Sequence, residues 1–147
     1  MKNSVWRHIC DHDKRLYDEL CVIMDLIPDD VELGSTCNGK RVELSCHIVA
    51  RGFANMFPHV RCVDGYFSDG FHHSWLMTEE FSLIDPFPVG MVAQPLLFWC
   101  HPACNMRLSD HLYQEEPIVM RGVYQHVGKW QFERAVEIFT QLLAGLR

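Results

Sequence analysis

The chain has 147 residues, enough for one domain with a large apolar core, because 48% of them are hydrophobic and 22% are charged. Its formal charge is −6, and its 13 basic residues are scattered along the chain, which disfavours nucleic acid and anionic membranes as partners. No stretch approaches about 20 apolar residues, and the N-terminus has no apolar signal core, so we expect a cytoplasmic protein. Seven cysteines are an odd number in a chain that needs no cross-links, which favours reduced thiols.

The first half of the sequence predicts two helices separated by a loop. Apolar residues recur at helical spacing between residues 4 and 27, which predicts an amphipathic helix that ends at Pro28. Residues 31–40 are rich in glycine, serine and asparagine, so we expect a loop there. The same helical period predicts a second helix over residues 44–57, with Cys46 in its first turn and on its buried side.

Beyond residue 58 the pattern changes to short runs of β-branched and aromatic residues separated by turn residues. These runs predict three antiparallel strands joined by hairpins, over residues 60–67, 74–77 and 81–84. The prolines of residues 86–95 indicate an irregular crossover, after which we expect strands near 96–99 and 118–124 and a final helix over about 129–146. The expected fold class is therefore α+β: N-terminal helices packed on a small antiparallel sheet, with a C-terminal helix covering the remaining apolar surface.

Three side chains in this arrangement have the chemistry of cysteine-dependent acyl transfer. Cys46 stands at a helix start, where free N–H groups and the helix dipole favour thiolate and can receive an oxyanion. His73, near the start of one strand, can act as its base, and Asp85, at the end of the neighbouring strand, can orient the imidazole. Each residue alone has a simpler explanation, as a core cysteine, a structural histidine and a turn aspartate. Their order and spacing favour the catalytic interpretation.

Four ordered segments within residues 44–88 resemble the transglutaminase-like superfamily. The first is a cysteine at the start of a helix with a small residue four positions on, and the last is an Asp-Pro pair. The segments are Cys46-His47-Ile48-Val49-Ala50-Arg51-Gly52-Phe53, Phe57-Pro58-His59-Val60-Arg61-Cys62-Val63-Asp64-Gly65-Tyr66, His73-Ser74-Trp75-Leu76 and Ile84-Asp85-Pro86. Ser74 replaces the usual alanine of that family.

The resemblance implies a papain-like fold for a single domain over residues 1–147. It implies that Cys46 is the nucleophile, His73 the base and Asp85 the residue that orients the base. His73 is preferred to His72 because Ser74-Trp75 follows it. The superfamily includes cysteine peptidases, deamidating enzymes, peptide N-glycanases and multidomain cross-linking enzymes, and the short chain disfavours the last of these.

We therefore expect a thiol hydrolase that needs no cofactor and no metal. Cys46 would attack an amide or thioester carbonyl of a peptide, a protein or a small acyl substrate and form an acyl-enzyme, as peptidases, amidases and deamidases do. Two alternatives stay open: transfer of the acyl group to an amine, and a binding or regulatory protein that keeps the fold without activity. The backbone N–H of Cys46 would form part of an oxyanion hole, and Asn38 is a candidate second donor or a simple turn residue.

Two clusters of potential metal ligands compete with this interpretation. One matches zinc spacing only in part, so buried cysteines in an irregular segment are the alternative. It consists of Cys100, His101 and Cys104, with His111 and His126 downstream. The other is the run 11–13 with His8 one turn earlier, where we expect a solvated stripe of mixed charge on an amphipathic helix.

Overall fold

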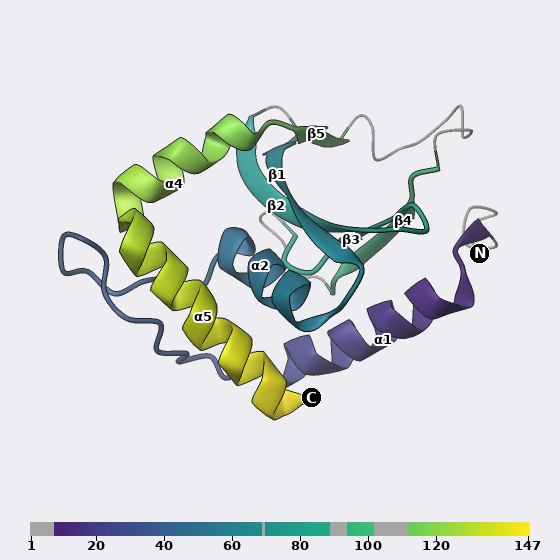
Figure 1. Ribbon diagram of the computed structural model, residues 1–147, viewed down its shortest axis with the longest axis horizontal. Coiled ribbons are helices and arrows are strands. Elements are labelled where there is room, and N and C mark those ends of the chain that lie inside the picture. The colour runs from purple at the N-terminus through teal and green to yellow at the C-terminus, as the bar shows by residue number, and fades with distance from the viewer. Residues whose placement is uncertain (1–7, 69, 89–93, 102–111) are drawn as a thin grey trace.

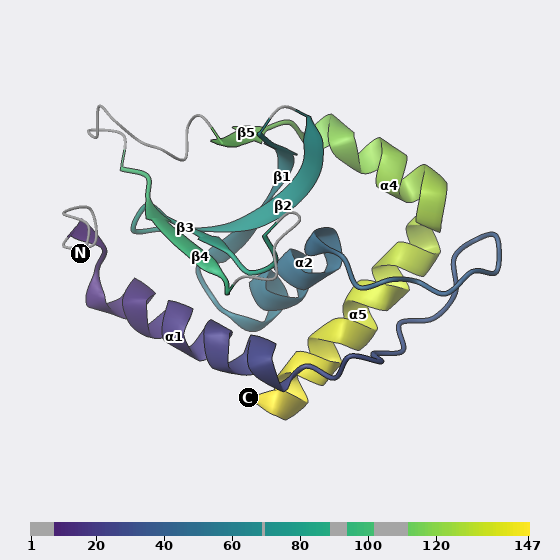
Figure 2. The same ribbon diagram turned by 180° about the vertical axis from the view of Figure 1, so that it is seen from behind.

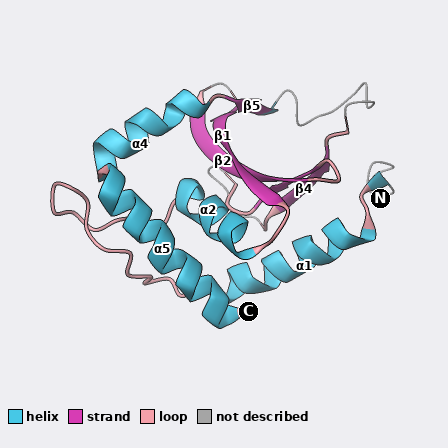
Figure 3. Cartoon of the chain, in the orientation of Figure 1, coloured by secondary structure: helices cyan, strands magenta, loops and turns pink. Residues whose placement is uncertain are grey.

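The computed structural model describes residues 8–68, 70–88, 94–101 and 112–147. Within those residues the fold is α+β, with four α-helices and a five-stranded antiparallel sheet of order β4-β3-β2-β1-β5, so the coarse fold class is confirmed (Figures 1 and 3). The helices are α1 (Asp11–Leu26), α2 (Cys46–Met56), α4 (Met120–Val127) and α5 (Lys129–Leu146). The strands are β1 (Val60–Phe67), β2 (Phe71–Thr78), β3 (Ser82–Asp85), β4 (Leu96–Trp99) and β5 (Tyr113–Glu115).

Helix α1 is shorter than the sequence predicted at its N-terminal end. It begins at Asp11, where the Cys10 sulfur accepts a hydrogen bond from the Asp13 N–H at 3.4 Å and caps the first turn. The helix ends at Leu26 because the residue before Pro28 is driven out of the helical region, and Ile27 has φ −70° and ψ 125°.

The expectation of a solvated stripe of mixed charge on this helix is wrong for Asp13, which is buried. Its side chain is 1% exposed, and Oδ2 accepts hydrogen bonds from the hydroxyls of Thr78 at 2.7 Å and Ser82 at 2.6 Å. A buried carboxylate needs such donors, so Asp13 fastens α1 to the β2–β3 turn. Across the described parts of the chain, no cluster of three or more histidine, cysteine, aspartate or glutamate side chains could hold a metal ion.

The sheet is built on a long hairpin between β1 and β2. Its register runs from the pair Val60 and Thr78 to the pair Phe67 and Phe71. The predicted strands over residues 60–67 and 96–99 are confirmed, and β2 begins three residues earlier than expected. Strand β3 begins at Ser82 because Phe81 has a φ of 64°, in the left-handed region, and closes the turn.

Successive residues of β2 contact different surroundings, because neighbouring side chains of a strand point to opposite faces of the sheet. Leu76 belongs to the main core, together with Phe53 of α2 and Phe139 of α5. Trp75 belongs to a second buried cluster, together with Tyr113 of β5. Helix α2 lies between the sheet and α5 (Figure 1).

The strand predicted over residues 118–124 is wrong. Those residues form a 3-10 turn over Pro117–Val119 and then α4, in which Met120, Val123 and Val127 follow a helical period. Proline fits the first position of such a turn because its φ is already suitable and its missing N–H is not needed there. The strand that the sequence did not predict is β5, which pairs with the end of β1.

The helical side of the molecule is completed by α5 and by residues 27–45, which run beside it (Figure 2). The predicted final helix is confirmed over Lys129–Leu146. Gly52 lets α5 approach α2, since a Cβ there would lie 2.5 Å from Phe139 Cδ1. Within the described segments, no helix combines the length and the apolar character needed to cross a membrane.

Candidate active site

The first turn of α2 presents Cys46. Ser45 is the N-cap, with extended backbone and a side-chain oxygen that accepts from the Ile48 N–H at 3.4 Å. The Val49 N–H donates to the Ser45 carbonyl at 2.9 Å. The N–H groups of Cys46 and His47 precede the first N–H that donates within the helix, that of Val49, so they are available to an anion at the helix start.

His73 and Asp85 form a buried pair on adjacent strands. The distance from His73 Nε2 to Asp85 Oδ2 is 2.7 Å, and both side chains are 0% exposed. The Tyr113 hydroxyl donates to the same Asp85 oxygen at 2.7 Å, and the Phe87 N–H donates to Oδ1 at 3.2 Å. Three donors therefore hold this carboxylate in place, and Asp85 in turn fixes the orientation of the imidazole.

The second nitrogen of His73 makes no hydrogen bond. Among the described residues, Nδ1 of His73 is the one buried side-chain nitrogen or oxygen atom without a partner. Burial lowers the pKa of His73, but Asp85 and then Cys46 raise it, and the net pKa is about 9. The Cys46 thiol therefore interacts with this imidazole and raises its pKa.

The pKa of Cys46 also reflects the interaction between the thiol and the imidazole of His73. Burial raises the pKa of this thiol, whereas the imidazoles of His47 and His73 lower it, so that it falls from 9.0 to about 6. Cys62 shifts the other way, because burial raises its pKa to about 12. A thiolate at neutral pH is therefore favoured at Cys46 and disfavoured at Cys62.

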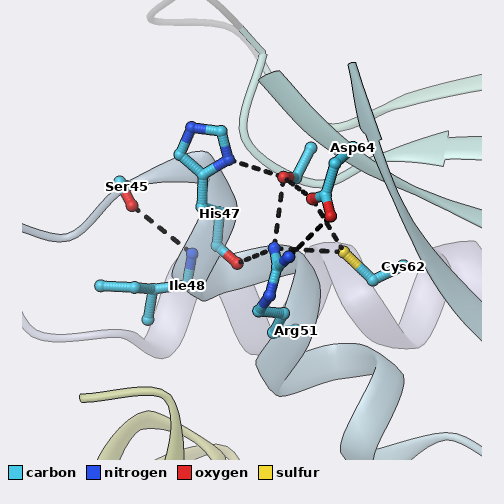
Figure 4. Close-up of polar contacts among 7 residues, drawn as sticks. Ser45, His47, Ile48, Arg51, Cys62 and Asp64 are labelled. Carbon is cyan, nitrogen blue, oxygen red and sulfur yellow. Dashed lines mark hydrogen bonds and ion pairs between the residues drawn. The ribbon is translucent and has the colours of Figure 1, made fainter. Parts of the chain in front are cut away.

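A second polar network, which the sequence analysis missed, lies between α2 and the sheet (Figure 4). Arg51 is paired with Asp64 at 2.7 Å, and its NH1 donates to the His47 carbonyl at 3.2 Å. The Ser74 hydroxyl donates to Asp64 Oδ1 at 2.6 Å and lies 2.6 Å from His47 Nδ1. An arginine on an apolar helix and an aspartate inside an apolar strand were the available signals, since charged residues are rarely buried without a partner.

Other predicted site residues lie apart from this arrangement. Asn38 is exposed in the turn between Ser35 and Arg41, and its side chain makes no hydrogen bond to any other described residue. That turn is fastened to α4 through the Cys37 N–H and the Val127 carbonyl at 2.8 Å. The contacts of Asn38 therefore give no support to a role as oxyanion donor.

The zinc alternative falls partly outside the described residues, because Cys104 and His111 are not among them. Of the remaining members, Cys100 is buried, and the ring of His101 stacks on Trp99 with centroids 5.5 Å apart. His126 is exposed on α4.

Comparisons of this chain with protein-family models, with curated proteins and with solved structures find no match. The class of the site is therefore argued from its own geometry: a helix-start thiol, an imidazole coupled to it and a buried carboxylate that orients the imidazole.

Proposed function

We propose that this protein is a thiol hydrolase with a transglutaminase-like, papain-like core, in which Cys46 attacks an amide or thioester carbonyl. The observation that carries the proposal is the buried imidazole of His73. Its Nε2 is bonded to Asp85, its Nδ1 has no hydrogen-bond partner, and the thiol that acts on it has a lowered pKa. These are the roles of nucleophile, base and orienting group in cysteine-dependent acyl transfer.

Acylation begins from a thiolate–imidazolium pair, which is the dominant form between the pKa values of about 6 for Cys46 and about 9 for His73. The sulfur attacks the carbonyl carbon, and the negative charge that develops on the carbonyl oxygen faces the free N–H groups at the start of α2. The imidazolium then gives its proton to the leaving amine or thiol. The C–N or C–S bond of the substrate breaks and an acyl-enzyme is left on Cys46.

Hydrolysis of the acyl-enzyme uses the same imidazole in its neutral form. Nδ1 of His73 takes a proton from water, and the water oxygen attacks the thioester carbon. The C–S bond breaks, the acid departs, and Cys46 returns as thiolate beside the imidazolium. The bond from Nε2 to Asp85 keeps that nitrogen protonated throughout, so Nδ1 is the atom that exchanges the proton.

The same intermediate allows two neighbouring outcomes. An amine that replaced water would make the protein an acyltransferase, and a binding or regulatory protein could keep the fold without turnover. Hydrolysis requires no second substrate site, which makes it the simplest reaction for these groups. Peptides, proteins and small acyl amides or thioesters are the substrate classes that a thiol nucleophile of this kind accepts.

The proposal is tested with a panel of peptide, glutamine-amide and acyl-thioester substrates. We expect turnover, and an acyl adduct at Cys46 detected by mass spectrometry, which Cys46→Ala abolishes. Cys62→Ala is the matched control, because that thiol has a raised pKa, and it should retain turnover. Turnover that survives in Cys46→Ala, or a complete panel that gives neither product nor adduct, would overturn the proposal.

A further inference from the structure

A cavity of about 310 Å³ adjoins the start of α2. Its walls include the chain neighbours of both reactive residues: Ser45 and His47 flank Cys46, and His72 precedes His73. The rest of the wall comes from α4, from Phe132 of α5 and from residues within 36–43. The cavity therefore lies against the two elements that carry the thiol and the imidazole.

The network beneath α2 determines which nitrogen of His47 carries a proton. Asp64, ion-paired with Arg51, only accepts hydrogen bonds, so the single hydroxyl proton of Ser74 is donated to Asp64. The Ser74 oxygen must then accept from His47 Nδ1, which lies 2.6 Å away. In the neutral ring, Nδ1 is thus the protonated nitrogen and Nε2 carries a lone pair.

His47 belongs to the cavity wall, and Nε2 is the ring nitrogen that Ser74 does not engage. The residue is 7% exposed, its Nδ1 is used by Ser74, and its ring is part of the cavity wall. Figure 4 shows the second ring nitrogen of His47 pointing away from Arg51, Cys62 and Asp64. Among the described residues, the His47 ring interacts with Ser74 and with the Cys46 thiol, and it has no further hydrogen-bond partner. A ligand group with an N–H would satisfy Nε2.

The remainder of the wall indicates what is attached to that N–H. Val42, Ile48, Val123 and Phe132 line the cavity with apolar surface. Gly122 adds no side chain, and a Cβ there would make an ordinary contact of 3.8 Å with the His72 ring. The wall also carries the polar side chains of Thr36, Arg41, Glu43, His72 and His126, but most of its surface is apolar. An aliphatic side chain next to an amide N–H matches the apolar part of the wall together with the acceptor on His47.

We propose that the cavity binds an amide segment of the substrate, with His47 Nε2 accepting a hydrogen bond from a substrate N–H and the adjoining aliphatic side chain lying against Val42 and Val123. This inference rests on the proposed function for the identity of the reacting carbonyl. It narrows the substrate class to peptide-like amides and disfavours acyl thioesters that have no N–H. His47 is then a binding residue that determines specificity.

The test measures binding to the Cys46→Ala protein, which cannot turn a substrate over. N-acetyl-leucine N′-methylamide and its analogue with both amide nitrogens methylated are titrated while the histidine ring and backbone signals are followed by NMR. We expect a saturable shift at His47 with the first probe and about fivefold or more weaker binding of the second, because the acceptor on His47 is left unsatisfied. His47→Phe keeps an aromatic ring without the lone pair and should remove the difference between the two probes.

Equal affinity of the two probes, shifts that map away from the cavity, or no saturable binding would overturn the inference. A neutral His47 that carries its proton on Nε2, seen in nitrogen-correlated spectra of the ring, would also overturn it. If His47→Phe does not fold, the two probes on the Cys46→Ala protein still decide the question. The Cys46→Ala protein lacks the proposed nucleophile, so a negative result in this binding test is distinguishable from a negative result in the turnover panel.

Discussion

The sharpest consequence of the site is the pH dependence of alkylation at Cys46. With pKa values of about 6 for Cys46 and about 12 for Cys62, about 90% of the first thiol and about one part in 10⁵ of the second are ionised at pH 7. A thiolate of lower pKa is intrinsically less nucleophilic, with a Brønsted coefficient of about 0.4–0.5, which removes a factor of about 10²·⁵ to 10³. Iodoacetamide should therefore modify Cys46 about 100-fold faster than Cys62.

The assay follows each cysteine by peptide mass spectrometry across a range of pH. In the unmodified sequence the rate at Cys46 should rise with a midpoint near pH 6 and then level off. His73→Gln removes one of the two imidazoles that lower the thiol pKa, while burial continues to raise it, so the midpoint should move to higher pH. Cys62→Ala, the matched control, should leave the midpoint where it was.

The reasoning would be refuted by a midpoint near the ordinary thiol value of 9 in the unmodified sequence. It would be refuted equally by a midpoint that does not respond to His73→Gln. Either result would mean that the imidazole does not act on the sulfur, and the assignment of His73 as base would have to be withdrawn.

Three further predictions concern the groups that support the site. Asp85→Asn should lower turnover by about 10²-fold or more. It should also move the alkaline limb of the kcat/KM profile from about pH 9 to lower pH, because Asp85 raises the pKa of His73. An alkaline limb that does not move would contradict that role of Asp85. Tyr113→Phe removes one of three donors from a buried carboxylate and should lower the free energy of unfolding by about 1–3 kcal/mol in urea titrations, whereas an unchanged midpoint would show the hydroxyl to be dispensable. Gly52→Ala should lower it by about 1–3 kcal/mol, because the new Cβ meets Phe139. Gly145→Ala, which meets nothing within 4 Å in α5, should raise it by up to about 1 kcal/mol, and equal effects of the two changes on the melting temperature would contradict the packing argument.

The elements that the sequence predicted well are those whose apolar period is long or whose boundaries carry turn residues. Strand β1 and helix α5 have the expected limits for this reason. Residues 118–124 were misassigned because valine, isoleucine and tyrosine favour strands, while the helical spacing continues to Val127 and starts from Pro117. Strand β5 has three residues and depends on pairing with a distant partner, so no local pattern could indicate it.

The candidate site likewise has residues that the sequence predicted and residues that it could not predict. Cys46, His73 and Asp85 were predicted because each stands at a recognisable place in an element, and the structure brings the last two within hydrogen-bond distance. Tyr113, which donates to Asp85, belongs to β5. Because the sequence did not predict that strand, it could not indicate the role of Tyr113. The network of Arg51 needs the pairing of α2 with two strands, which is a tertiary arrangement rather than a local one.

The register of the β1–β2 hairpin also decides whether a folded molecule is a working one. His73 and Ser74 are consecutive residues that serve opposite faces of β2, so a slip of one residue would turn the base toward Arg51 and a hydroxyl toward Asp85. Gly65, which stands opposite His73, constrains the pairing of β1 with β5 on its other side, because a Cβ in its place would collide with the Gln114 carbonyl of β5. A misregistered chain would keep its helices and much of its circular dichroism while being chemically inert. For refolded material, counting reactive Cys46 thiols is therefore a better measure of native protein than any spectrum of secondary structure.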